Sequence, residues 1–311
     1  MSDKALNKIL ISIVGPTAIG KTALSIRLAK HFSTEIISAD SRQFFKEMSI
    51  GTAKPSPEEL AQAPHHFINS HSIKNLFSTG DFETQALNKL KDIFETHDTA
   101  IMVGGSGLYI NAVCNGLDEL PETDLNIRAR LNQQFENEGI DAIKKELKQS
   151  DPEYYSRVDQ ANPQRMIRGL EFFLSTGSKL SSYQTNRKKN RPFHILSIGL
   201  NTDRTLLYKR INHRVDLMMQ AGLLEEVRTL APYKNLNALK TVGYSEIFEY
   251  LDDNSTLEEA IDKIKQNTRR FAKRQLTWFR KNANTKWFEP HQTTEIIDYL
   301  KSAIDQIKLA Q

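Results

Sequence analysis

The first part of the chain alternates short apolar runs with segments of helical periodicity. The runs Lys8–Val14, Thr34–Ala39 and Thr99–Val103 have the length and composition of buried strands. A helical pattern follows the possible caps Ser78 and Thr79 and places apolar side chains on one face, namely Phe82, Ala86, Leu90, Ile93 and Phe94. This alternation predicts a parallel sheet covered by helices on both sides, with chemistry at the carboxyl ends of its strands.

The hydrophobic pattern changes in the second half of the chain. Residues 118–192 read as helices and loops interrupted by prolines, and the next strand candidate is His194–Leu200. From Asp203 onward the periodicity is helical throughout, with an amphipathic stretch from Thr256 to Asn282. We therefore predict an α/β core made of residues 1–117 and 193–311, a mostly helical insertion over 118–192 and a long C-terminal helix.

A glycine-rich loop with the pattern G-x-x-x-x-G-K-T follows the first predicted strand. Its residues are Gly15, Pro16, Thr17, Ala18, Ile19, Gly20, Lys21 and Thr22. A strand, such a loop and a following helix direct backbone N–H groups and the positive end of the helix dipole at one anion. Lys21 adds a charge for terminal phosphates, and the Thr22 hydroxyl is placed to ligate Mg²⁺. The core is thus predicted to be a parallel sheet of the P-loop type that binds a phosphate compound, nucleotides such as ATP included.

Two further strand ends carry residues suited to chemistry. Asp40 opens the motif DSRQ after the second strand, and Ser106 lies in a glycine-rich turn after the third. A carboxylate at Asp40 would point into the crevice of the phosphate loop, where it can bind Mg²⁺ through water or act as a general base. A turn or cap aspartate is equally common there, and a plain tight turn would explain the glycines beside Ser106.

P-loop ATPases usually end an apolar strand in an aspartate that holds Mg²⁺. Here Val103 runs into glycines instead, which weakens the ATPase interpretation.

Composition narrows the class of protein. The chain has 311 residues, 26% of them charged and 39% hydrophobic, as in ordinary globular proteins. The single cysteine, Cys114, excludes an intramolecular disulfide framework and a cysteine-built zinc site, and we expect it to be a small buried side chain. No segment approaches the roughly 18 apolar residues of a membrane span, and the N-terminus does not read as a secretory signal. We therefore expect a cytoplasmic monomer that does not bind membranes.

Basic residues are concentrated near the C-terminus. Between positions 263 and 281 there is no acidic residue, and the basic ones are Lys263, Lys265, Arg269, Arg270, Lys273, Arg274, Arg280 and Lys281. Like charges at i and i+4 repel unless an anion compensates them, so a nucleic-acid backbone is the favoured partner. Phe271, Trp278 and Phe279 are interleaved and would pack the helix, and a solvated helix docked by these rings is the alternative. A second cluster is formed by Gln164, Arg165 and Arg168.

Taken together, these motifs strongly resemble the bacterial tRNA dimethylallyltransferases, also called tRNA isopentenyltransferases. The matching segments occur in the family's order, namely GPTAIGKT, DSRQ, GTAKP, His65-His66, GGSGLY, Asn162–Arg168 and Lys273–Arg280. Ser106 stands where many members have threonine, which keeps the hydroxyl. The resemblance implies transfer of a dimethylallyl group from dimethylallyl diphosphate to N6 of the adenosine beside the tRNA anticodon, with Mg²⁺ as cofactor. His65 and His66 are expected to be structural.

The resemblance also implies roles for individual residues. Asp40 would be the general base, and Ser106 and Arg214 would assist departure of the diphosphate held by the loop. Without the resemblance, Arg214 would not be preferred over Arg210 in the predicted helix Asp203–Gly222. The implied tRNA contacts are Asp40, Ser41, Arg42, Gln43, Ser106, Arg128, Gln164, Arg165, Met166, Ile167 and Arg168.

Three other functions share part of this pattern. A P-loop kinase would use the same loop and Mg²⁺ but would consume ATP and has no need of the basic helix. An isopentenyltransferase acting on free adenylate has less use for the insertion. A non-catalytic RNA-binding protein would tolerate loss of Asp40.

Overall fold

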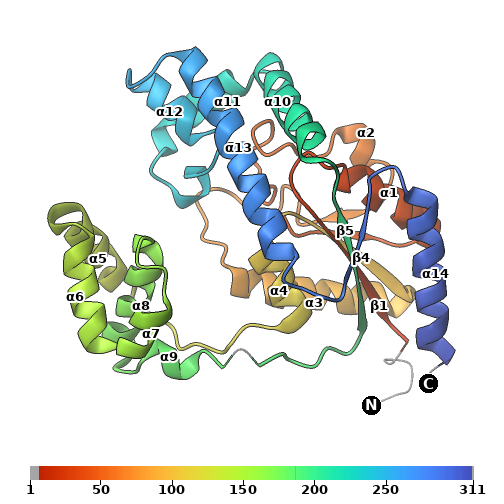
Figure 1. Cartoon of the computed structure of the whole chain (residues 1–311), viewed down its shortest axis with the longest axis horizontal. Coiled ribbons are helices and arrows are strands. Elements are labelled where there is room, and N and C mark those ends of the chain that lie inside the picture. Colours follow the sequence, from red (N-terminus) through yellow and green to blue (C-terminus); the bar gives the residue numbers. More distant parts are fainter. Residues whose placement is uncertain (1–6, 186, 310–311) are drawn as a thin grey trace. The chain divides into compact units, whose positions relative to one another are not determined.

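A computed structural model describes residues 7–185 and 187–309 (Figure 1). The chain divides into two compact units, residues 1–114 with 190–311 and residues 115–189. The second unit overlaps the insertion expected over 118–192. The expectation that the N-terminus is not a secretory signal concerns residues 1–6, which lie outside the described residues. Among the described helices, none is long and apolar enough to cross a membrane.

The first unit contains a parallel sheet of six strands in the order β3-β2-β4-β1-β5-β6. The strands are β1 (Ile9–Val14), β2 (Ile36–Ser38), β3 (His65–His66), β4 (Thr99–Val103), β5 (His194–Leu200) and β6 (Thr285–Phe288). The P-loop-type α/β fold is confirmed, and the four predicted strands are present. The expectation that everything after Asp203 is helical is wrong at β6, because a four-residue edge strand is too short to show a period.

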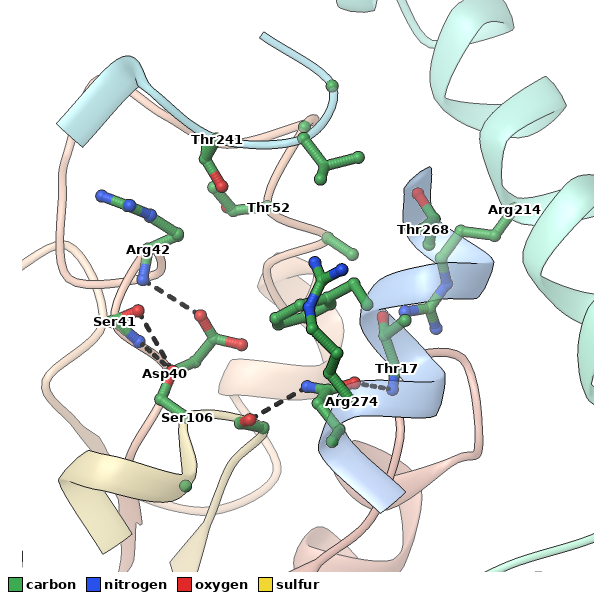
Figure 2. Close-up of a pocket in the computed structure, with 18 of the residues that line it drawn as sticks. Thr17, Asp40, Ser41, Arg42, Thr52, Ser106, Arg214, Thr241, Thr268 and Arg274 are labelled. Atoms are coloured by element: carbon green, nitrogen blue, oxygen red, sulfur yellow. Dashed lines mark hydrogen bonds between the residues drawn. The ribbon is translucent and has the colours of Figure 1, made fainter. Parts of the chain in front are cut away.

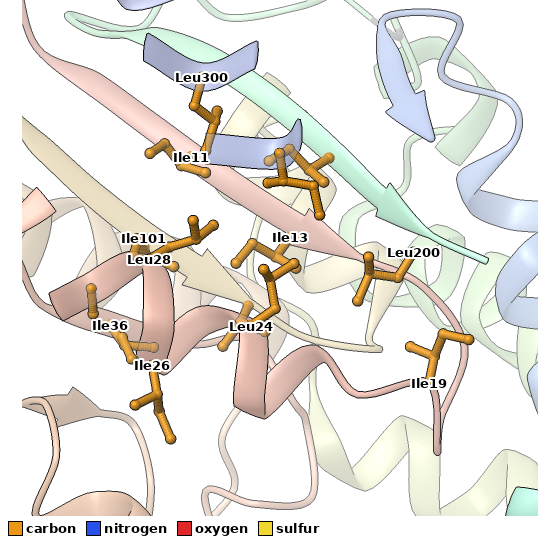
Figure 3. Close-up of a cluster of buried hydrophobic side chains, with 14 of the residues drawn as sticks. Ile11, Ile13, Ile19, Leu24, Ile26, Leu28, Ile36, Ile101, Leu200 and Leu300 are labelled. Carbon is orange, nitrogen blue, oxygen red and sulfur yellow. The ribbon is translucent and has the colours of Figure 1, made fainter. Parts of the chain in front are cut away.

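Helices cover both faces of this sheet. On one face, α1 (Lys21–Phe32) and α14 (Thr293–Leu309) pack on the inward side chains of β1 and β4 (Figure 3). On the other face lie α3 (Thr79–Thr96) and α4 (Gly107–Asn115). The predicted start of α3 is correct, because Ser78 and Asp81 form a capping box around it. The sheet is buried on both sides, so its functional groups are confined to the strand ends.

A helical layer of the same unit extends beyond the strand ends. It consists of α10 (Arg204–Gln220), α11 (Leu223–Leu230), α12 (Ser245–Leu251) and α13 (Leu257–Phe279), with the 3-10 turns Ala231–Tyr233 and Asn237–Leu239 between α11 and α12. The short helix α2 (Pro57–Leu60) lies between β2 and β3 in the chain. Its core includes Val215, Tyr244 and Ile264, and it also takes in Phe45 and Met48 from the segment after β2. A capping box at Thr256 starts α13, one residue after the predicted start of the amphipathic stretch.

The second unit is helical and has a core of its own. Its helices are α5 (Leu125–Glu138), α6 (Ile140–Ser150), α7 (Pro152–Arg157), α8 (Pro163–Thr176) and α9 (Leu180–Tyr183). Leu131, Ile143, Leu147 and Phe172 are fully buried within it. Asp151 caps α7 and accepts hydrogen bonds from the N–H and hydroxyl of Ser181, which fixes α9 to α7. α8 supplies much of this core through Met166, Ile167, Leu170 and Phe172.

Candidate active site

The phosphate loop joins β1 to α1 and lines a cavity of about 360 Å³. Lys21 is half-buried there, and its ammonium donates hydrogen bonds to the carbonyl oxygens of Gly15 (3.0 Å) and Pro16 (2.8 Å). Burial lowers the pKa of Lys21 to about 8, with Asp40 opposing the shift and Arg214 adding to it. The charges of these three side chains therefore act on one another inside the cavity, although they come from three distant segments of sequence.

Two strand ends place Asp40 and Ser106 beside the loop. The N–H of Ala39 donates to the carbonyl of Val103 at 2.7 Å, so the chain leaves β2 and β4 side by side. One oxygen of Asp40 accepts the backbone N–H of Arg42 at 3.0 Å. The Ser106 hydroxyl accepts the N–H of Ser41 (2.9 Å) and donates to the Ser41 hydroxyl (3.1 Å). The two predicted motifs thus lock each other in position, and the Asp40 carboxylate faces the cavity.

A second cavity, of about 450 Å³, adjoins the first (Figure 2). Asp40 and Arg214 line both cavities, together with Thr17, Thr52, Phe271 and Gln275. In Figure 2, Asp40, Ser41 and Ser106 lie on one side, while Arg214 from α10 and Arg274 from α13 lie on the other. Burial lowers the pKa of Arg214, and Glu59 and Asp40 oppose the shift. A molecule in the first cavity and one in the second would therefore meet at Asp40.

Gln275 joins the phosphate loop to the Ser106 turn, and we did not predict it. Its side-chain oxygen accepts the N–H of Thr17 at 2.9 Å, and its amide donates to the carbonyl of Gly105 at 2.9 Å. A Cβ at Gly105 would lie 2.3 Å from the Gln275 amide nitrogen, so only glycine leaves room for this contact. Gln275 thereby fixes the separation of two loops that line the cavities.

A second residue that the sequence analysis missed is the carboxylate Glu226, which holds the cavity wall at residues 49–53. Glu226, on α11, accepts the backbone N–H groups of Ser49, Ile50 and Gly51 at 2.8–3.0 Å and the hydroxyl of Tyr244 at 2.6 Å. The Gln43 amide donates to the carbonyls of Thr52 and Ala53, both at 3.2 Å. The GTAKP motif noted in the sequence is therefore a wall segment that other residues hold in place.

The two histidines differ in position. His66 pairs with Glu35 at 2.5 Å, which is a structural contact at the sheet edge. His65 lines the loop cavity, its Nδ1 lies 2.7 Å from the Ala63 carbonyl, and burial lowers its pKa. Cys114 is only partly exposed and packs against the core, where burial raises the pKa of its thiol to about 12.

In the second unit, the predicted RNA contacts on α8 divide by exposure. Gln164 and Arg165 are exposed, whereas Met166 and Ile167 are fully buried in that unit's core. Arg168 and Arg128 both pair with Glu171, whose side chain is only 1% exposed. The Met166 and Ile167 side chains thus support the helix, while Gln164 and Arg165 are available at its surface.

The basic stretch of α13 is also divided in two. Near its start, Lys263 pairs with Glu249 at 3.0 Å and Lys265 with Asp216 at 2.6 Å, and Arg269 donates to the Asn212 side chain at 2.6 Å. These partners lie on other helices, so the local sequence does not reveal them. Phe279 is buried, as packing of the aromatic face requires, but Phe271 and Trp278 are 38% and 40% exposed.

Fold and site together define an α/β protein in which a cavity lined by the glycine-rich loop adjoins a second, partly apolar one. Comparisons with known proteins narrow this class. A family model described as IPP transferase matches residues 43–282. Two relatives are similar to this chain over nearly its whole length. The tRNA dimethylallyltransferases of Christiangramia forsetii and Flavobacterium johnsoniae are 56% and 54% identical to this chain, and each match covers 96% of this chain and 100% of the relative.

Solved structures agree. The tRNA isopentenylpyrophosphate transferase of Bacillus halodurans is 37% identical, with a TM-score of 0.73, and 97% of this chain and 99% of that one are covered. A eukaryotic dimethylallyltransferase acting on tRNA is 28% identical with a TM-score of 0.76, over 92% of this chain and 75% of that one. The chain belongs to the IPP transferase family, that of the tRNA dimethylallyltransferases.

Proposed function

We propose that this protein transfers the dimethylallyl group of dimethylallyl diphosphate to N6 of the adenosine beside a tRNA anticodon. The observation that carries the proposal is the position of Asp40, whose carboxylate borders both the phosphate-loop cavity and the adjoining cavity. The donor's diphosphate would occupy the first cavity and the target base the second, so that the reacting atoms meet beside a base. That the protein is a cytoplasmic monomer stays a prediction.

Asp40 would supply the general base. The exocyclic amine of adenine is a weak nucleophile because its lone pair is delocalised into the ring. A carboxylate that accepts one N6 hydrogen raises the nucleophilicity and takes the proton as the new C–N bond forms and the C–O bond to diphosphate breaks. The Arg42 N–H holds one oxygen of Asp40, which orients the carboxylate for this step. The products are N6-dimethylallyladenosine and diphosphate.

Negative charge grows on the bridging oxygen of the leaving diphosphate, and several groups are placed to stabilise it. Lys21 and the loop amides lie at one end of the cavity, and Arg214 reaches it from α10. In the described structure Lys21 contacts only loop carbonyls at 3 Å or less, contacts that a phosphate oxygen would replace. The Ser106 hydroxyl fixes Ser41 and lines the cavity where the base would lie.

The donor set fits Mg²⁺. No group of three or more His, Cys, Asp or Glu side chains that could hold a metal occurs among the described residues. Mg²⁺ usually keeps several waters and takes one or two protein ligands plus substrate phosphates. The Thr22 hydroxyl, at the start of α1 in the loop cavity, would be such a ligand, and Asp40 faces the same space. When bound, the ion would neutralise charge on the diphosphate.

For the RNA, the target base has to leave its stack to reach a cavity inside the protein. A single-stranded anticodon loop permits this at modest cost. From the second unit, the exposed Gln164 and Arg165 and the Arg128–Glu171–Arg168 cluster are proposed to contact the tRNA. From the first unit, the segment Asp40–Gln43 is proposed to contact the RNA near the target base. The basic residues from Arg270 to Lys281, which have no carboxylate partner among the described residues, would hold the phosphate backbone.

Product analysis tests the function directly. The protein is incubated with Mg²⁺ and dimethylallyl diphosphate, and with either unmodified tRNA or AMP as acceptor, in the presence or absence of ATP. We expect modified adenosine in tRNA and one diphosphate released for each, without ATP. Modification of AMP but not of tRNA would favour a free-adenylate enzyme, and an absolute ATP requirement would favour a kinase or ATPase. Binding of tRNA without any transfer would contradict the catalytic proposal.

A further inference from the structure

One face of α13 carries an open groove beside the second cavity. The groove has a volume of about 410 Å³ and is lined by Arg270, Lys273, Arg274, Thr277, Trp278 and Lys281. Positions 270, 273/274, 277/278 and 281 recur every three or four residues, so they form a single stripe along the end of α13 and the turn after it. Such a stripe is usually apolar and packed against the core. Here it is exposed, and four of its six side chains are cationic.

The charges of this groove have no acidic partners among the described residues. Within residues 7–185 and 187–309, no ion pair with a carboxylate involves any of the four cations, whereas Lys263 and Lys265 on the same helix each have one. Four cations close together repel one another, so an external polyanion would be strongly favoured as a partner. The basic residues early in α13 are thus neutralised by carboxylates of other helices, whereas those at its end are not neutralised by any described carboxylate.

Trp278 gives the groove an aromatic surface. A Cβ at Gly107 would lie 2.2 Å from Cδ1 of Trp278, so the indole is seated on the bare backbone of the Ser106 turn. The ring is nevertheless 40% exposed, and the Lys281 ammonium lies 5.6 Å from its centroid. A fixed, half-exposed ring flanked by cations is the arrangement that proteins use to stack a nucleobase while holding its phosphates.

The groove is continuous with the proposed base-binding cavity. Arg274 and Trp278 line both, and Arg274 extends toward the cavity that holds Asp40 in Figure 2. We propose that this groove binds the nucleotide next to the target adenosine, with its base stacked on Trp278 and the adjacent phosphates held by Arg270, Lys273 and Lys281. This inference rests on the proposed function, and it specifies how the RNA next to the extruded base is held.

Affinity measurements with altered protein and altered RNA test the groove. The RNA is a synthetic anticodon stem-loop with the target adenosine, either intact or with an abasic site at one or the other neighbouring position. Trp278→Ala should weaken binding of the intact RNA by roughly 5- to 150-fold in Kd, the range expected for loss of one base–aromatic stack. Trp278→Phe should retain most of the affinity. Lys263→Ala, which removes a charge already paired with Glu249, is the matched control and should change little.

Coupling between the two changes is the decisive result. If the neighbouring base stacks on Trp278, an abasic site at one neighbouring position weakens binding to the wild type but not further to Trp278→Ala. Independent, additive losses would overturn the proposal. So would unchanged affinity of the wild type for both abasic RNAs, a measurement that requires no protein variant and holds even if Trp278→Ala fails to fold.

Salt dependence tests the phosphate contacts. Replacing Arg270, Lys273 and Lys281 together by alanine should reduce the slope of log K against log salt by about two, since each single-strand phosphate contact contributes roughly 0.7. An unchanged slope would show that the stripe is merely solvated. Wild-type transfer from dimethylallyl diphosphate to tRNA is measured alongside. Transfer that occurs while the Trp278→Ala and abasic losses are additive and the salt slope is unchanged would refute RNA binding in the groove and leave the proposed function standing. Absence of transfer would refute the proposed function itself.

Discussion

Replacing Gln275 by alanine would separate the two loops that the structure holds together. The change removes the hydrogen bonds to Thr17 N–H and Gly105 C=O, both 2.9 Å long. Each neutral hydrogen bond contributes about 1 kcal/mol, and leaving its partner unsatisfied costs about 1–3 kcal/mol when water cannot enter. Because cavities adjoin the side chain and water can enter, we expect a loss of about 2–3 kcal/mol in the free energy of unfolding.

Gln275→Ala should also slow the reaction in the protein that remains folded. Thr17 lies in the phosphate loop and Gly105 precedes Ser106. Because the two Gln275 hydrogen bonds hold these loops at a fixed separation, losing them lets the donor shift relative to Asp40. A misplacement of 1 Å can slow a reaction by about 10²-fold. Steady-state kinetics with varied dimethylallyl diphosphate at saturating tRNA, with urea unfolding in parallel, measure both quantities. We expect kcat to fall by about that factor and tRNA affinity to stay within about twofold.

Gln266, an exposed glutamine on the same helix, provides the matched control. Gln266→Ala should alter stability by less than about 0.5 kcal/mol and leave kcat unchanged. A folded Gln275→Ala protein with wild-type kcat and donor KM would refute this role of Gln275, because the two loops would then keep their positions without its hydrogen bonds.

Other predictions concern the loop, its pH dependence and the cavity wall. Lys21→Ala or Thr22→Ala should abolish turnover through lost diphosphate and Mg²⁺ binding while tRNA affinity, measured by filter binding, survives; equal loss of tRNA affinity would contradict this division. The pKa of Lys21 lies near 8, so donor affinity should be full below that pH and fall by about tenfold per pH unit above it. Lys54 also has a pKa of about 8, so the titration should persist in Lys54→Gln and vanish in Lys21→Arg. Glu226→Ala should lower the free energy of unfolding by about 3 kcal/mol, since several charge-assisted hydrogen bonds are lost. Glu225→Ala, whose side chain is exposed and pairs only with nearby Arg228, should lower it by less than about 0.5 kcal/mol in the same urea titration.

The central strands could be predicted because each is a mainly apolar run, and β1, β2 and β4 are buried along their whole length. β3 and β6 could not, since two and four residues at a sheet edge have no period that distinguishes them from loop. The strand-end motifs were found for a related reason: parallel strands bring their carboxyl ends to one edge, so Asp40 and Ser106 were expected near the phosphate loop.

Residues whose roles depend on distant partners were not predictable. Gln275 contacts Thr17 across 258 positions of sequence, and Glu226 contacts the turn at Ser49 across 177. Nothing local distinguishes either from a surface residue. The same limit applies to Lys265, which reads as an unpaired charge until α10 brings Asp216 to it. Met166 and Ile167 belong to the motif Asn162–Arg168, yet they lie on the buried side of α8, which the motif alone does not reveal.

The central claim is that Asp40 takes the proton from adenine N6, and single-turnover kinetics of Asp40→Asn test it most directly. The variant keeps the shape and one acceptor oxygen but loses the basicity. With tRNA and dimethylallyl diphosphate saturating, transfer is timed across a Mg²⁺ titration. We predict a chemical step slower by roughly 10²–10⁴-fold at every Mg²⁺ concentration, with donor affinity nearly unchanged. Recovery to near the wild-type rate at high Mg²⁺ would contradict the account and make Asp40 a metal-binding residue.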